Sequence, residues 1–366
     1  MIQTRSQFSH ERYLWLDQAR GVVALLFIVS AITWSHRGDL LLEKPTLGPT
    51  WLDHGYNYYN GSPPIITIID VGQPIFLFLV GFSGYIAFSS RLRNKSRWAA
   101  CRYAVRRVLA LYLLSIAGQL IADLGGGAPA DWRSLLEQFN WKAVFLTDVL
   151  AVIALGAAST YLSVLLISSA DWRAWFALAL LVVHAFLQAM LVAEHQPFID
   201  SVLGWPQWSF RVLSLSALSI LGSSFGQWIH DAPGEMRSRL QKRVMPVACG
   251  CLVLGYCMEW VQPSEHHGAT MALMLLAAGL SGLLLVVAIA MGEMELEVPL
   301  LTGLGRNLLL VFILAGVLGD FYFRLIPDWL VYDSPWAALG LLGLAPICAI
   351  VALTRLLEKY GIALRV

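Results

Sequence analysis

Residues 65–88 read IITIIDVGQPIFLFLVGFSGYIAF, and this run has enough apolar side chains for a helix that crosses roughly 30 Å of hydrocarbon. Asp70 stands inside the predicted span, and Pro74 is expected to interrupt its hydrogen-bond ladder one turn later. A carboxylate at membrane depth costs about 2.5 to 3.5 kcal/mol on insertion scales, so it is usually turned inward and partnered. We therefore predict a polar site at this helix, with Gly81 as part of its motif.

The segment before this span is rich in polar side chains. His54 and Asn60 lie in the loop WLDHGYNYYNGSPP that leads into it. An imidazole titrates near neutral pH and can act as a general base without a metal, so His54 is the best candidate for proton transfer. We predict a catalytic group of His54, Asn60 and Asp70. An exposed loop histidine with no role in catalysis is the alternative reading of His54.

The composition is that of a polytopic, all-α membrane protein. The chain has 366 residues, of which 58% are hydrophobic and 13% charged. Its net charge of +1 argues against a nucleic-acid partner, which needs a concentrated basic face. The five cysteines lack metal-ligand spacing, so we expect no metal site. The whole chain, residues 1–366, is predicted to form a single transmembrane domain.

A bundle of about ten transmembrane helices is predicted from the apolar runs. These runs cover residues 16–34, 65–88, 107–124, 143–167, 173–194, 210–230, 244–262, 269–291, 307–325 and 337–355. Cytoplasmic loops accumulate Lys and Arg, and most of the 25 basic residues fall inside when both termini are cytoplasmic. We therefore expect an integral, multi-pass protein, with the bacterial inner membrane as its predicted location and a homodimer as a possible assembly.

Two further clusters of polar residues flank the predicted spans. Asp17 and Arg20 are three residues apart beside Gly21, so they can share a helix face and form an ion pair. This cluster is equally consistent with an orientation signal, in which Arg20 reaches the headgroups and Asp17 is its counter-ion.

The second cluster is LTGLGRN, residues 301–307. Its glycines, Arg306 and Asn307 are predicted to begin a helix whose N-terminal amides could receive a phosphate, although a simple helix start is as consistent with the pattern. Arg107 and its basic neighbours Arg102 and Arg106 are further candidates for a phosphorylated ligand, because guanidinium groups match phosphate geometry.

These clusters occur in the order found in the heparan-α-glucosaminide N-acetyltransferase-like family of transmembrane acyltransferases, which the chain resembles. The resemblance covers most of the chain, including LGSSFGQW from Leu221 and EHHGATMALMLLAAGL from Glu265, and it is most specific within residues 12–91 and 301–312. Four stretches in these two ranges support it best. They are LDQARGV at 16–22, His54 followed by YNG at 59–61, IIDVGQPIFLFLVGFS at 68–83, and LGRN at 304–307. Ser30 and Tyr59 depart from the family pattern, in which we expect Asn and Trp.

The resemblance implies that an acyl group, in the founding activity acetyl, moves from cytoplasmic acetyl-CoA to a carbohydrate-like acceptor. His54 would be its catalytic histidine, and Arg20, Arg107, Arg306 and Asn307 are the candidate donor-binding residues. The implied partners are acyl-CoA, the acceptor and membrane lipid.

Three alternatives are also consistent with the sequence. Type 3 acyltransferases also open with an Asp and an RG-like pair, but we expect their histidine early in the first span, and His36 lies past it. A proton-coupled transporter or flippase would use Asp17, Asp70 and Glu259 as relay groups. A non-catalytic protein that keeps the scaffold is the third alternative.

Overall fold

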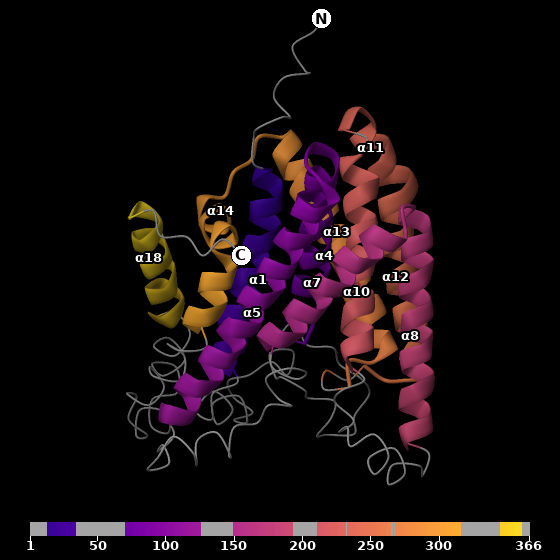
Figure 1. Ribbon diagram of the computed structural model, residues 1–366, viewed down its shortest axis with the longest axis horizontal. Coiled ribbons are helices and arrows are strands. Elements are labelled where there is room, and N and C mark those ends of the chain that lie inside the picture. The colour runs from indigo at the N-terminus through magenta and orange to yellow at the C-terminus, as the bar shows by residue number, and fades with distance from the viewer. Residues whose placement is uncertain are drawn as a thin grey trace, which may run out of the picture. The chain divides into compact units, whose positions relative to one another are not determined.

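The computed structural model describes residues 13–33, 70–125, 149–192, 211–231, 233–264, 266, 268–315 and 345–360. All regular elements in these ranges are helices, as the composition predicts (Figure 1). The chain divides into two compact units. Unit 1 comprises Met1–His54, Thr67–Gly72 and Leu283–Arg365, and unit 2 comprises Gly55–Ile66 and Gln73–Gly282.

The described residues of unit 1 form α1 (Leu14–Thr33), α14 (Pro299–Arg306), α18 (Ala345–Lys359) and the part of α13 (Met271–Glu293) that follows Gly282. A further helical segment covers residues 308–315. Unit 2 contains the longer helices. They are α4 (Gly72–Asn94), α5 (Arg97–Gly125), α7 (Val149–Leu166), α8 (Ala170–Val192), α10 (Arg211–His230), α11 (Met236–Arg239), α12 (Met245–Met258), the start of α13, a 3₁₀ turn at Pro233–Glu235 and a π-helical turn at Leu240–Val244.

Five described helices are long and apolar enough to cross a membrane. They are Gly72–Asn94, Val149–Leu166, Ala170–Met190, Arg211–His230 and Met271–Glu293. Each falls on a predicted span, so the chain has the helices of a membrane protein. The remaining spans of the predicted ten, the cytoplasmic termini and the single domain over residues 1–366 stay predictions.

The start of α4 differs from the sequence prediction. This helix begins at Gly72, so Asp70 and Val71 form a turn before it and Pro74 is its third residue. The first four N–H groups of a helix have no intrahelical partner, and proline is therefore tolerated there. The expectation that Pro74 interrupts a hydrogen-bond ladder is wrong, and Asp70 is buried in the turn rather than inside the helix.

Unit 2 is built on close contacts between α4 and α10. A side chain at Gly81 would overlap the carbonyl of Ser219, and one at Gly222 would overlap that of Phe78. Small residues let two helix backbones approach in this way. Membrane helices associate largely through such van der Waals packing, because there is no hydrophobic driving force between them in lipid. Gly81, predicted as a motif residue, therefore has a packing role in unit 2.

Hydrogen bonds between hydroxyl groups join α7 to α10. The Oγ1 of Thr160 and the Oγ of Ser219 lie 2.8 Å apart, and Ser159 donates to Ser216 at 3.1 Å. Because these hydroxyls are satisfied between helices, α10 can be almost fully buried despite its serines.

Candidate functional site

The site with the clearest chemistry lies in unit 1, where α1 and α14 pack at backbone distance. A Cβ at Gly21 would overlap the carbonyl of Leu301, and a Cβ at Gly305 would overlap that of Asp17. Both glycines belong to the stretches that carry the family resemblance, LDQARG and LGRN. Glycine is needed at both positions because only hydrogen fits there. Two motifs from opposite ends of the sequence thus lie side by side.

Asp17 is the charged centre of this contact. It lies in the first turn of α1, and only 1% of its surface is exposed. Its carboxylate pairs with Arg20 from the same helix at 3.5 Å and with Arg306 from α14 at 3.7 Å. The predicted pairing of Asp17 with Arg20 is confirmed, and the second cation was not predicted. A buried carboxylate that holds two arginines fixes both guanidinium groups beside the α1–α14 contact.

A helical segment begins at residue 308, where the ninth span was predicted to start, but the glycines of LGRN do not form its N-terminus. Gly303, Gly305 and Arg306 lie inside α14, which ends at Arg306, and the next helical segment covers residues 308–315. The glycine amides are therefore engaged in a helix and do not form an N-terminal anion site. Gly305 serves the close approach of the two helices instead.

Asn307 occupies the junction between α14 and the next helical segment. Its side chain is 1% exposed and donates weakly from Nδ2 to the carbonyl of Gly303 at 3.4 Å. Its Oδ1 is buried and has no hydrogen-bond partner within the described ranges. An amide held in this way has an acceptor that a ligand or water could satisfy.

Gln18 of α1 forms hydrogen bonds with the segment that precedes α14. Its Nε2 donates to the carbonyl of Leu296 at 2.9 Å, and its Oε1 accepts from the backbone N–H of Val298 at 3.1 Å. The side-chain amide thus makes one donor and one acceptor bond to the backbone, as a neighbouring β-strand would. These two bonds hold the backbone immediately before Pro299, the first residue of α14. Sequence reasoning missed Gln18, because a single glutamine beside Asp17 has no periodic signal.

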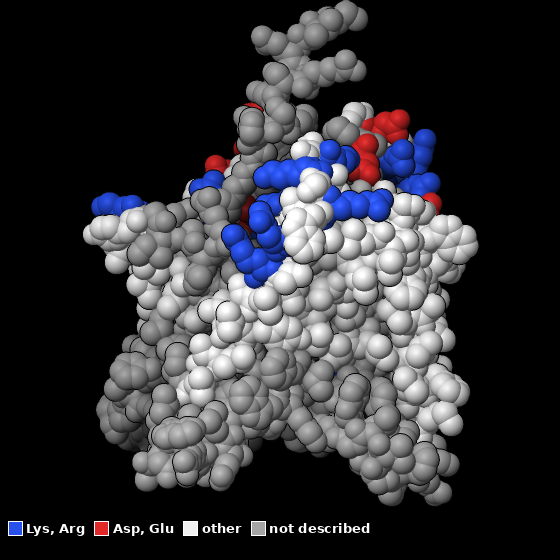
Figure 2. Space-filling model, viewed as in Figure 1, with Lys and Arg blue, Asp and Glu red and all other residues white. Residues whose placement is uncertain are grey.

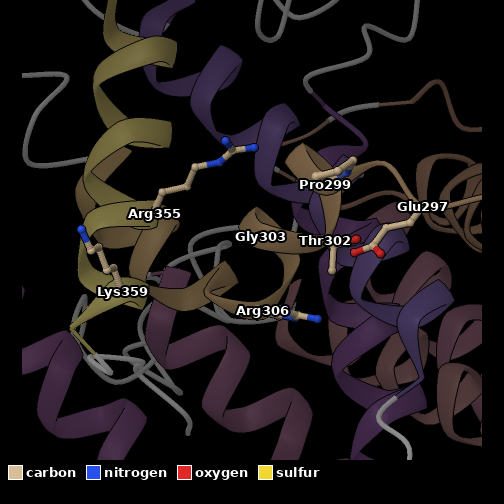
Figure 3. A pocket seen from close by; sticks show the side chains of 7 residues that line it. All are labelled: Glu297, Pro299, Thr302, Gly303, Arg306, Arg355 and Lys359. Carbon is tan, nitrogen blue, oxygen red and sulfur yellow. The ribbon is translucent and has the colours of Figure 1, made fainter.

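A pocket of about 430 Å³ opens in unit 1 beside this contact (Figure 3). Its lining comes from α14, the segment before it and α18. The lining residues are Glu297, Pro299, Thr302, Gly303, Arg306, Arg355 and Lys359. In Figure 3 the side chain of Arg355 extends from α18 toward α14, and Glu297 lies near Thr302 on the other side.

Positive charge predominates in this pocket. Three of its residues are cations, Arg306, Arg355 and Lys359, whereas Glu297 is the single acid in the lining. Arg355 and Lys359 are exposed and form no ion pair with any other described residue. A pocket with excess cations, two of them arginines, fits a phosphorylated ligand, since a guanidinium binds phosphate oxygens through two parallel hydrogen bonds.

Sequence reasoning identified Arg306 but missed the two cations of α18. Arg355 and Lys359 counted only as inner-tail charges in the topology prediction. They are four residues apart, so they share one helix face, and this spacing was the available signal. Their contribution to a pocket depends on the packing of α18 against α14, which the sequence does not reveal.

Arg107, the fourth predicted donor-binding residue, belongs to unit 2. Its Nη1 donates to the hydroxyl of Tyr161 at 3.1 Å and to that of Tyr103 at 3.4 Å. Its Nε is buried with no hydrogen-bond partner in the part of the chain that the structure describes. The guanidinium of Arg91 stacks on the ring of Tyr103, with its Cζ 3.6 Å from the ring centroid. Arg107 therefore links α5 to α7, and its role in donor binding stays a prediction.

The predicted catalytic group is only partly described. His54 and Asn60 lie outside the described residues, and Asp70 lies in the buried turn before α4. The geometry of a proton transfer from His54 therefore stays a prediction. Within the described ranges, no group of three His, Cys, Asp or Glu side chains is arranged to hold a metal ion.

Arg173 is a buried cation that sequence reasoning counted only as an inner-loop charge. It is fully buried in α8 and donates to Gln227 at 2.6 Å, to Ser223 at 3.1 Å and to the carbonyl of Ile167 at 2.8 Å. The ring of Tyr85 lies 5.1 Å from its guanidinium. Because these partners come from α4, α10 and the end of α7, Arg173 joins the helices of unit 2.

A second polar cluster in unit 2 ties the turn between α12 and α13 to α8. His184 is buried and its Nε2 lies 3.1 Å from the carbonyl of Gly268. One turn further along α8, Gln188 accepts from Gln262 at 2.8 Å. Both contacts hold the turn in place, and this structural role accounts for the two polar side chains of α8.

No model of a known protein family matches the chain, and a comparison with curated proteins finds no significant match. The relation to the heparan-α-glucosaminide N-acetyltransferase-like family therefore stays a prediction that rests on the motifs quoted above.

Proposed function

We propose that the chain is a membrane-embedded acyltransferase. It moves an acyl group, in the first instance acetyl, from a coenzyme A thioester to an amino or hydroxyl group of a carbohydrate-like acceptor. The observation that supports this proposal best is the contact between LDQARG and LGRN in unit 1, which holds Arg306 between Asp17 and the cationic pocket.

The pocket is the proposed site for the phosphates of the donor. Coenzyme A has a diphosphate and a 3′-phosphate, and the pocket lining includes three cations, Arg306, Arg355 and Lys359, that could bind phosphate groups. Asp17 orients Arg306 and Arg20, so that neither arginine has to be ordered when the donor binds. The long pantetheine arm would then carry the thioester away from the pocket toward the reacting groups.

The proposed reaction is a direct transfer. The acceptor nitrogen or oxygen bonds to the thioester carbon while His54 takes its proton, and the C–S bond breaks. Coenzyme A leaves as a thiolate and receives that proton from His54. The amide of Asn60 or Asn307 would stabilise the oxyanion formed on the carbonyl oxygen, and Asp70 would be a polar group of the acceptor or thioester channel.

Release of free thiol from acetyl-CoA tests this function. Purified full-length protein in detergent is given a panel of amino sugars and simple glycans, with the wild type beside His54→Ala. We expect the variant to lose release and to keep coenzyme A binding, because it removes the base and not the phosphate contacts. Release that is unchanged in the variant would remove His54 from the mechanism.

The donor pocket has its own test. Replacing Arg355 and Lys359 together by Gln should weaken coenzyme A binding about five- to thirtyfold, since exposed ion pairs contribute up to about 1 kcal/mol each. The matched control is Arg237→Gln with Lys242→Gln, which removes two exposed cations from unit 2. An equal loss in both double variants would contradict a specific pocket. No thiol release and no coenzyme A binding by the wild type would favour the transporter alternative.

A further inference from the structure

Helix α5 carries an exposed stripe that no part of the described chain covers. Its residues recur at a spacing of three or four, so they lie on one helix face. They are Trp98, Arg102, Val105, Arg106, Leu109 and Leu113. Trp98 is 76% exposed and Leu113 is 65% exposed. The stripe is therefore a surface of unit 2, and it changes from cationic to aliphatic along the helix.

The two arginines of this stripe are one helical turn apart. Arg102 and Arg106 are exposed, and neither forms an ion pair or a hydrogen bond with another described residue. Like charges at this spacing destabilise a helix by a few tenths of a kcal/mol. A negative group that bridges the two guanidiniums would turn this repulsion into an attraction.

Several arginines of unit 2 have partners in their own unit, whereas Arg237 and Lys242, like Arg102 and Arg106, are exposed and form no ion pair with another described residue. Arg93 pairs with Asp231 at 3.1 Å, and Arg243 pairs with Asp171. Arg107, on the adjacent face of α5, donates to two tyrosines. The pair at 102 and 106 differs from the other exposed cations in lying on the same helix face as the exposed Leu109 and Leu113, so an external group could contact both kinds of side chain.

The arginine pair and the leucines follow one another along the stripe in the order of the phosphate and the acyl chains of a phospholipid. Trp98 stands first, and tryptophan prefers the membrane–water interface. The arginine pair follows at the level of a headgroup, and Leu109 and Leu113 come next, where acyl chains would lie. At the end of unit 2 where α5 begins, Figure 2 shows Lys and Arg side chains gathered in a band, and white side chains cover the helices beyond it.

We propose that Arg102 and Arg106 form a binding site for an anionic phospholipid, with the phosphate between the two guanidiniums and an acyl chain against Leu109 and Leu113. Two adjacent cations favour a headgroup with net negative charge, because the choline of a zwitterionic headgroup would be repelled. This assigns Arg102 and Arg106 to lipid binding instead of the donor binding suggested by the sequence. The inference does not depend on the proposed catalytic activity.

Native mass spectrometry of the purified full-length protein tests the site. Phosphatidylglycerol and phosphatidylcholine with the same acyl chains are titrated onto the wild type, onto Arg102→Gln with Arg106→Gln, and onto Arg237→Gln with Lys242→Gln. We expect the first double variant to bind phosphatidylglycerol about tenfold more weakly, while its affinity for phosphatidylcholine and the behaviour of the control are unchanged. Arg102→Lys with Arg106→Lys should retain binding within about threefold.

Three results would overturn the proposal. The first is equal affinity of the wild type for the two lipids, and the second is an equal loss of phosphatidylglycerol binding in the matched control. The third is displacement of the lipid by glycerol 1-phosphate at the same concentration, because that would mean that the site recognises a free phosphate rather than a lipid. If the Gln double variant does not fold, the single variant Arg102→Gln should show an intermediate loss, and full retention there contradicts the site.

Discussion

Arg173 of unit 2 and Arg355 of unit 1 are both arginines of apolar helices, but the fold places them in opposite surroundings. Arg173 is fully buried and donates to Ser223, Gln227 and a backbone carbonyl. Arg355 is exposed, lines the pocket of unit 1 and has no ion pair within the described ranges.

This difference extends to the packing of each unit. In unit 2 glycines and hydroxyls bring the helices together, so that polar groups such as Thr160 and Ser219 satisfy one another. In unit 1 the same kind of glycine contact, at Gly305, holds Asp17 beside Arg306 at the edge of a cationic pocket. Tight packing therefore serves stability in one unit and the placement of charge in the other.

The largest expected effect comes from adding one methyl group at the glycine contacts. Gly81→Ala and Gly305→Ala should each lower the free energy of unfolding by up to about 3 kcal/mol, because the new Cβ overlaps a backbone carbonyl that has to move. Thermal unfolding in detergent measures the change. Only Gly305→Ala should also weaken coenzyme A binding under conditions in which the protein remains folded.

The control for this pair is Gly118→Ala in α5, where a Cβ would meet no atom within 4 Å. Alanine is about 0.5 to 1 kcal/mol better than glycine in a helix interior, so this variant should be slightly stabilised. Equal destabilisation of all three variants would mean that the close contacts are not the cause.

A smaller effect is expected when the two arginines are exchanged for an apolar residue of similar length. Arg173→Met should cost about 2 kcal/mol, since it leaves the part-buried oxygens of Gln227 and Ile167 without their donor. Arg355→Met should change stability by less than about 0.5 kcal/mol and should weaken coenzyme A binding about fivefold. The opposite result would contradict these two roles: folded Arg173→Met would lose coenzyme A binding, and Arg355→Met would keep it.

The smallest effect concerns the hydroxyl pair of unit 2. Ser219→Ala should lower the free energy of unfolding by about 0.6 kcal/mol, the typical value for a hydrogen bond between membrane helices. A double-mutant cycle with Thr160→Ala isolates the pair, and a coupling energy near zero would show that these hydroxyls do not stabilise the α7–α10 contact.

Several elements of the fold could be predicted because their signal is local. The apolar runs at 149–166 and 271–293 predict spanning helices from composition alone, and the structure has helices there. The ion pair between Asp17 and Arg20 followed from their spacing on one helix. The start of α4 was wrong, since Pro74 suits either a kink or a first turn and only the observed turn at Asp70 distinguishes the two.

The candidate site was harder to predict because its partners are far apart in the chain. Arg306 was identified, but its ion pair with Asp17 and its place beside Arg355 depend on how α1, α14 and α18 pack. Arg106 and Arg107 are neighbours in sequence with opposite surroundings, one exposed and the other bound to tyrosines. No local pattern separates them, because the orientation of α5 against α7 decides which face is covered.

The sequence by itself determined that this chain forms apolar helices suited to a membrane, since hydropathy is a sum over neighbouring residues. It also supplied the motifs on which the acyltransferase proposal rests. Only the tertiary structure decided which charges are buried, which pair across helices and which remain available to a ligand, because a side chain's electrostatic surroundings are set by residues that are distant in sequence and close in space.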